Sequence, residues 1–125
     1  MRLLSLLFVF LLTLSVAPLA ADARSDAKKQ VEFGIAVSQR GLWREAIYRW
    51  ERAAQIDPKY AEAYNDLAIA YEHEGDLEKA RVAYEKALEL EPNNALIKQN
   101  YELFKEINDR TTRKDTQDSA DNQNP

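Results

Sequence analysis

The chain repeats itself with a period of 34 residues. When residues 27–60 are aligned with residues 61–94, eight pairs are identical, namely Ala27/Ala61, Ile35/Ile69, Ala36/Ala70, Gly41/Gly75, Ala46/Ala80, Glu51/Glu85, Ala53/Ala87 and Pro58/Pro92. A fixed period of this length is typical of stacked helical repeats, in which each unit packs against its neighbours. The period therefore predicts an extended interaction surface rather than a reaction centre.

Each unit has the pattern of two amphipathic helices joined by a glycine turn. In the second unit, apolar residues recur at helical spacing over 61–74, Gly75 follows, and Asp76 stands where it can cap the next helix. Pro92 closes the unit because proline cannot continue a helix interior. We expect a small residue on the first helix of each unit to let the paired helices cross closely, with a large aromatic residue beside it.

These residues resemble the tetratricopeptide repeat (TPR) family. The second unit matches the family pattern at each of its characteristic positions, namely Tyr64, Leu67, Ala68, Tyr71, Gly75, Ala80, Tyr84, Ala87 and Pro92. The first unit departs at Gln30, where a large aromatic is usual, and at Val37, where tyrosine is usual. The resemblance implies an all-α fold, an α-solenoid of two helix-turn-helix units with repeats at 27–60 and 61–94.

A third unit starts at Ala95 but fails, because Glu102 stands where a small residue belongs. One side of this segment is apolar, and we expect it to cover the end of the second repeat as a capping helix over 95–110, with the apolar residues Ile97, Tyr101, Phe104 and Ile107. The TPR domain would then span 24–110. Residues 111–125 have no periodic apolar position and are expected to form a disordered polar tail.

Residues 1–23 are predicted to be a signal peptide. Arg2 precedes an apolar run, Leu3–Val16, and small residues follow up to Ala23, after which we place the cleavage site. This predicts an exported, periplasmic protein. The alternative is an uncleaved segment that anchors the module in the inner membrane.

Composition and motifs argue against most kinds of chemistry. The formal net charge of −4 does not favour nucleic-acid binding, and a chain without cysteine has no thiol nucleophile or Cys-based metal site. The lone His73 lies between two glutamates that do not face it on a helix, so it does not indicate a metal site. Glycine occurs only at positions 34, 41 and 75, which form no phosphate-binding loop. We expect no enzymatic activity, no cofactor and no metal.

The resemblance also implies a concave groove, lined by the first helices of successive repeats, that receives a segment of a partner protein. The matching positions are Lys28, Val31, Ile35, Ser38, Gln39, Glu62, Asn65, Ile69, Glu72 and His73. Ile35 and Ile69 either anchor apolar side chains of the partner or pack against their neighbours inside the curve. The expected function is that of an interaction module, or adaptor, in the bacterial cell envelope. The alternative is a self-associating structural module, because two repeats bury little core of their own.

Overall fold

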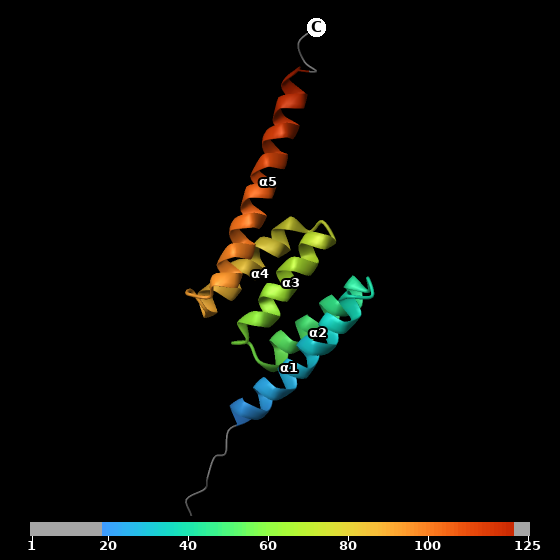
Figure 1. Ribbon diagram of the computed structural model, residues 1–125, viewed down its shortest axis with the longest axis vertical. Helices are drawn as coiled ribbons and strands as arrows, with labels where there is room; N and C mark the ends of the chain where they lie inside the picture. The colour runs from blue at the N-terminus through green and yellow to red at the C-terminus, as the bar shows by residue number, and fades with distance from the viewer. Residues whose placement is uncertain (1–18, 122–125) are drawn as a thin grey trace, which may run out of the picture.

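Five α-helices follow one another along residues 19–121, the part of the chain that this computed structural model describes (Figure 1). The helices are α1 (Leu19–Ser38), α2 (Trp43–Ile56), α3 (Ala61–His73), α4 (Leu77–Leu90) and α5 (Ala95–Asp121). Helices α1 and α2 form one hairpin and α3 and α4 form the next, with α2 packed against α3 and α5 against α4. The expected all-α solenoid is confirmed. Within residues 19–121, no helix combines the length and the apolar character that a membrane span requires.

The turns inside both hairpins depend on glycine. Gly41 and Gly75 each have a φ of 78°, which is the left-handed region that other residues enter at a cost. After the second turn, the Asp76 side chain accepts a hydrogen bond from the backbone N–H of Lys79 at 3.2 Å and caps α4 as expected. Helix α3 ends at His73, so that Glu74 is its C-cap rather than its last residue.

The core is narrow and consists largely of alanines and a few aromatics. Ala46, Ala68 and Ala80 are fully buried where the helices of each hairpin cross. Trp50 and Tyr84 are buried beside these crossings, in agreement with the expected alternation of small and large residues. Helices can approach closely only where small side chains face each other, which is why the core tolerates so little bulk.

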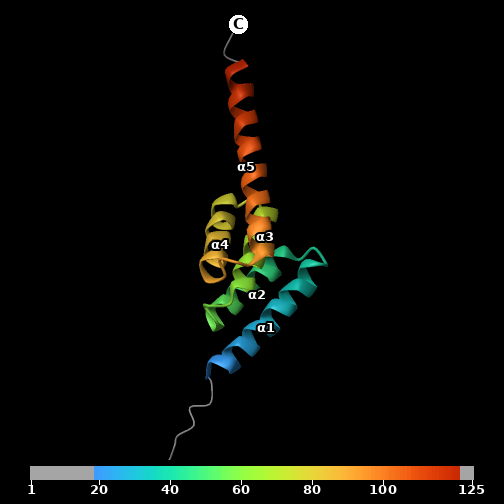
Figure 2. The same cartoon turned by 60° about the vertical axis from the view of Figure 1, so that its left-hand side comes forward.

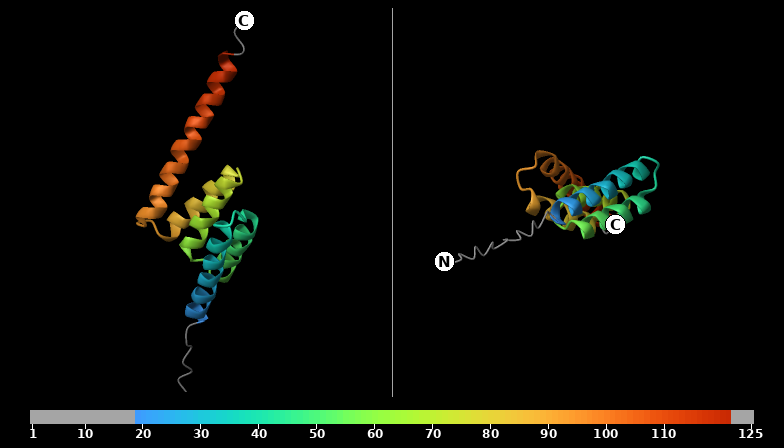
Figure 3. Two further views of the ribbon diagram at one scale, coloured as in Figure 1. Left: turned by 45° about the vertical axis from the view of Figure 1, so that its right-hand side comes forward. Right: turned by 90° about the horizontal axis from the view of Figure 1, so that it is seen from below.

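Helix α5 differs from the expected capping helix in length. It continues to Asp121, so residues 111–121, which we expected to be disordered, are helical, and residues 122–125 lie outside the described part. No glycine or proline interrupts this stretch, and hydroxyl groups such as that of Thr112 donate to carbonyl oxygens one turn earlier. Figures 2 and 3 show the C-terminal half of α5 standing free of the other helices.

The apolar side of α5 also differs from the expectation at one residue. Ile97 and Phe104 are buried against the second repeat and Tyr101 is half-buried, but Ile107 is 52% exposed. Ile107 lies at a cleft that it lines together with Leu77, the first residue of α4, which leaves its side chain partly open. The α5 helix thus covers the second repeat only with its first turns.

The expected signal segment falls mostly on residues 1–18, outside the described part. The predicted cleavage site after Ala23 lies within the first turns of α1, and the first buried residue, Ala27, follows it. The Arg24 side chain holds α1 to the loop after α2, because it donates to the Asp57 carboxylate and to the Lys59 carbonyl. The Arg24 guanidinium keeps the pKa of Asp57 below its usual value. Cleavage after Ala23 would leave these contacts in place.

Candidate functional site: the face of the first helices

Two exposed isoleucines mark the candidate groove. Ile35 on α1 and Ile69 on α3 are each 37% exposed, although they are separated by one full repeat. They occupy the same position in their units and lie on first helices that contact each other. Both side chains are therefore accessible. On α3 the residues on either side, Ala68 and Ala70, are buried, whereas on α1 Ala36 beside Ile35 is exposed as well.

Two of the expected groove residues are part of the interior instead. Val31 is 1% exposed and belongs to the core, and Asn65 is 4% exposed. The Asn65 side-chain carbonyl accepts a hydrogen bond from the Asn100 amide on α5 at 3.1 Å. Both residues lie where one first helix meets the next, so the seam between repeats buries most of each side chain. Asn65 still borders a pocket of about 320 Å³ that Tyr60, Glu62 and Asp66 also line.

The other expected groove residues lie at the surface. Lys28, Gln39, Glu62 and His73 are exposed, and Ser38 and Glu72 are half-buried. Several already have partners. Lys28 Nζ lies 4.0 Å from Glu32, and the Ser38 hydroxyl donates to the Ile35 carbonyl at 2.8 Å.

The carboxylates of the central helix α3 accept hydrogen bonds from tyrosines. Glu62 accepts from the Tyr60 hydroxyl at 2.7 Å, and Glu72 accepts from the Tyr84 hydroxyl. Burial, followed by the hydrogen bond to Glu72, raises the pKa of Tyr84. These phenols therefore remain neutral donors that position the carboxylates on the candidate face.

Asp66 on α3 has a buried carboxylate oxygen without a hydrogen-bond partner among the described residues. Its Oδ2 atom is buried and accepts no hydrogen bond from the described part of the chain, while Oδ1 has only the Asn65 amide at 3.4 Å. Burial, with a smaller contribution from the Glu62 charge, raises the pKa of Asp66 to about 7. In the repeat register, Asp66 corresponds to Asn100, and Val31 corresponds to Asn65. The first seam thus has valine where the second has an asparagine that can form a hydrogen bond.

An aromatic pair at the end of the face was not foreseen from the sequence. The His73 imidazole stacks on the Trp43 indole, with ring centroids 4.1 Å apart and an angle of 21° between the planes. Trp43 begins α2 and His73 ends α3, so the contact joins the two repeats at their turns. The only signal in the sequence is that both residues lie two positions from a turn glycine.

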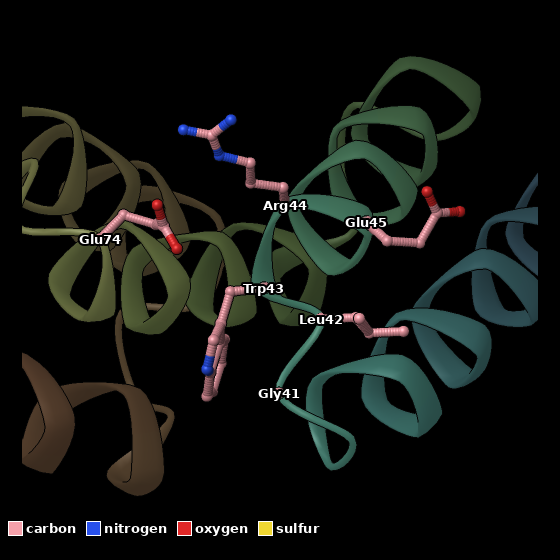
Figure 4. A pocket seen from close by; sticks show the side chains of 6 residues that line it. All are labelled: Gly41, Leu42, Trp43, Arg44, Glu45 and Glu74. Carbon is pink, nitrogen blue, oxygen red and sulfur yellow. The ribbon is translucent and has the colours of Figure 1, made fainter.

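A wide hollow beside this pair does not have the features of a catalytic site. It has a volume of about 530 Å³ and lies between the start of α2 and the end of α3 (Figure 4). Its side chains point in different directions: Trp43 and Leu42 point apart, and Arg44 and Glu45 point away from both. Catalysis requires polar groups that converge on one position, and this hollow does not provide them. Within residues 19–121, no cluster of three or more His, Cys, Asp or Glu residues could hold a metal ion.

The fold and the face together define the class of protein. Successive helical hairpins joined by glycine turns, with the first helices side by side at the surface, form a helical-repeat solenoid. Solenoids of this kind present binding surfaces. Comparison with known families assigns the repeat: residues 61–94 match the family described as tetratricopeptide repeat, and residues 36–75 match a second family described as TPR repeat. The chain belongs to the tetratricopeptide repeat family.

Its relatives are longer proteins. The chain is 37% identical over 71 residues to small glutamine-rich tetratricopeptide repeat-containing protein 2 of Mycosarcoma maydis, which covers 57% of this chain and 20% of that protein. It is 32% identical over 89 residues to type IV pilus assembly protein PilF of Pseudomonas aeruginosa, covering 70% of this chain and 35% of PilF. It is 29% identical over 85 residues to the chloroplastic tetratricopeptide repeat domain-containing protein PYG7 of Arabidopsis thaliana, covering 68% of this chain and 28% of PYG7. The chain thus spans about a third or less of the length of these relatives.

Proposed function

We propose that the protein is a non-enzymatic interaction module that holds a segment of another protein against α1 and α3. The observation that supports this proposal is the pair Ile35 and Ile69, equally exposed at equivalent positions of two successive repeats. The exposed part of each side chain adds nothing to stability, whereas its burial by a partner is favourable by about 25 cal/mol per Å². TPR repeats are typical of proteins that act as scaffolds for other proteins.

An affinity capture from native cell extract tests this function. The wild-type protein is compared with an Ile35→Asp/Ile69→Asp variant and with a Val82→Asp control, whose valine is also exposed but lies on α4. Circular dichroism first establishes that all three are folded. A partner retained by the wild type and the control, and lost by the double variant, supports the proposal. The same partner recovered with all three proteins refutes it.

We also propose that the protein works in the bacterial cell envelope. The predicted signal peptide supports this location, and so does the similarity to PilF, whose name describes a type IV pilus assembly protein. Cell fractionation and the intact mass of the purified protein test the location. A mass that lacks residues 1–23 in the periplasmic fraction supports export, and the full mass in the membrane fraction favours the anchored alternative. A full-length protein in the cytoplasm contradicts both.

Self-association remains the competing function. Light scattering at tens of micromolar protein separates the two functions. A strict monomer leaves the binding of another protein as the function, whereas an oligomer that the Ile35→Asp/Ile69→Asp variant cannot form would replace it.

A further inference from the structure

A third exposed aliphatic residue extends the row formed by Ile35 and Ile69. Leu103 on α5 lies another 34 residues along the chain and is 54% exposed. We call Ile35, Ile69 and Leu103 the aliphatic row. It takes one residue from each first helix, α1, α3 and α5, at the same position of the repeat. The sequence predicts only a capping role for α5, and an exposed Leu103 does not contribute to that role.

A hydrogen bond between helices indicates that Leu103 and Ile69 lie on the same side of α5 and α3. The Asn100 amide on α5 donates to the Asn65 side-chain carbonyl on α3 at 3.1 Å. Residues three or four positions apart share a helix face, and Leu103 and Ile69 follow these asparagines by three and four positions. The two aliphatic side chains therefore lie on the same side of the helices, one turn beyond the bonded pair, and the two helices run in the same direction (Figure 1).

An apolar cleft continues the row along α5. It has a volume of about 130 Å³ and lies between the start of α4 and the middle of α5, lined by Glu72, Leu77, Phe104, Ile107, Asn108 and Thr111. Among these residues Phe104 is buried, while Leu77 and Ile107 are exposed. An apolar cavity of roughly 150 Å³ is known to hold a benzene-sized group, so this cleft has room for about one aliphatic or aromatic side chain.

The charges around the row are negative. Helix α3 carries Glu62, Asp66 and Glu72 and no lysine or arginine, and none of these three carboxylates forms a salt bridge with a described residue. On α1, Lys28 is offset by Glu32. The uncompensated charge at the centre of the face is therefore acidic, although Asp66 contributes only part of a charge near neutral pH. A partner with basic residues beside its apolar ones fits this face.

The spacing of the row favours a helical partner over an extended one. The axes of packed neighbouring helices lie about 8–10 Å apart. Seven residues of an α-helix rise about 10 Å, which brings residues i and i+7 onto successive members of the row. Residues on one side of an extended strand repeat every ~7 Å and would fall out of step.

We propose that a basic amphipathic helix of another protein crosses α1, α3 and α5, with its apolar side on Ile35, Ile69 and Leu103. One of its apolar side chains enters the cleft between Leu77 and Ile107. The basic residues of this helix face Glu62 and Glu72. This inference rests on the proposed function and specifies the chemistry of the partner and the residues of the face that bind it.

The test uses three synthetic peptides and the purified protein in the form that cells produce. The first is an amphipathic leucine/lysine helix, the second has glutamate in place of lysine, and the third has the composition of the first in an order that is not amphipathic. Binding is followed by the fluorescence anisotropy of labelled peptide at physiological ionic strength. The protein variants are Leu103→Asp, Ile107→Asp and Glu62→Gln/Glu72→Gln, with Val82→Asp as the control because Val82 has the same 54% exposure as Leu103 but lies on α4.

The expected result is that only the leucine/lysine helix binds and that Leu103→Asp and Ile107→Asp each weaken its binding at least tenfold. Glu62→Gln/Glu72→Gln should weaken binding and reduce its salt dependence, while Val82→Asp should change neither. Equal binding of the second or third peptide would overturn the inference, and so would unchanged binding by Leu103→Asp. If Leu103→Asp proves unfolded by circular dichroism, Leu103→Ala and Ile107→Asp provide the same comparison.

The outcome is separable from that of the proposed function. A native partner lost by Ile35→Asp/Ile69→Asp but kept by Leu103→Asp and Ile107→Asp would retain the function and refute this inference. Failure of the double variant to lose any partner would refute the function itself.

Discussion

Gly34 lies directly against the indole of Trp50. A β carbon on residue 34 would come to 2.7 Å from Cε2 and 2.8 Å from Cδ1 of that ring, closer than real atoms approach. The indole also donates from Nε1 to the Val31 carbonyl at 3.1 Å, which fixes it in place. In the second repeat, the equivalent pair is Ala68 and Tyr84, a larger residue opposite a smaller ring. The two crossings thus fill the same space with different partners.

Gly34→Ala is expected to lower the free energy of unfolding by about 1–3 kcal/mol, because it overpacks the crossing. The double variant Gly34→Ala/Trp50→Tyr copies the second repeat and should recover much of this loss. Thermal denaturation followed by circular dichroism measures both. If the double variant loses more unfolding free energy than the two single variants lose together, the two crossings are not equivalent and the explanation is wrong.

Gly75→Val is expected to destabilise the turn between α3 and α4 through backbone strain of roughly 1–2 kcal/mol. Space is not the reason, because a β carbon on Gly75 would meet nothing within 4 Å. Gly75→Asn should cost less, since asparagine tolerates positive φ better than β-branched residues do. Chemical denaturation distinguishes the two variants, and equal losses would argue against strain at φ 78°.

Asp66→Asn is expected to remove a dependence of stability on pH. The folded-state pKa of Asp66, about 7, lies above its value in the unfolded chain, about 4. The protonated form is therefore favoured by folding, and its contribution is complete below pH ~4 and is lost as the pH rises through 7. This difference between the two pKa values corresponds to no more than about 4 kcal/mol of unfolding free energy. Relative to wild type, Asp66→Asn should become progressively more stable from pH 4 to pH 8.

A matched variant on the exposed part of α5, Asp109→Asn, provides the control for this profile. Its side chain is exposed, so this variant removes one carboxylate without altering a buried site. A flat difference between Asp66→Asn and wild type across this range would show that Asp66 is ionised when folded.

Asn100→Ala is expected to cost about 1–3 kcal/mol, because it leaves the buried Asn65 carbonyl without its donor. The neighbouring Gln99 is exposed, so Gln99→Ala should stay within about 0.5 kcal/mol of wild type. A double-mutant cycle with Asn65→Ala measures the coupling between the two asparagines. A coupling near zero would mean that the bond does not hold α5 to α3.

Removal of residues 113–125 is expected to leave the unfolding midpoint unchanged while lowering the helical signal. The side chains of 113–119 are exposed, so this part of α5 contributes helix without burying core. Loss of stability on truncation would reveal a contact of the α5 end that supports the repeats.

The repeat pattern predicted the helices well because it is a local property. The glycine turns, the cap by Asp76 and the order of the five helices follow from residues near one another in sequence. The end of α5 was missed for the same reason: a polar segment without apolar periodicity gives no packing signal, yet nothing in it breaks a helix.

The candidate face was predictable only in part. The register placed Ile35 and Ile69 at equivalent positions, and both are exposed, but it could not show that Val31 and Asn65 are largely buried at the seams. It also did not predict that His73 stacks on Trp43, or that Leu103 and Ile107 are exposed. Each of these depends on how one hairpin lies on the next.

The 34-residue period by itself determined the class of fold, the helix pairs and the turns, because those follow from side chains a few positions apart. The stacking of the hairpins decided which equivalent residues became core, seam or open surface. Equivalent positions differ because, within residues 19–121, no helix precedes the first unit and no second helix follows α5. Burial depends on neighbours in space, and a repeat at the end of a stack lacks one of them.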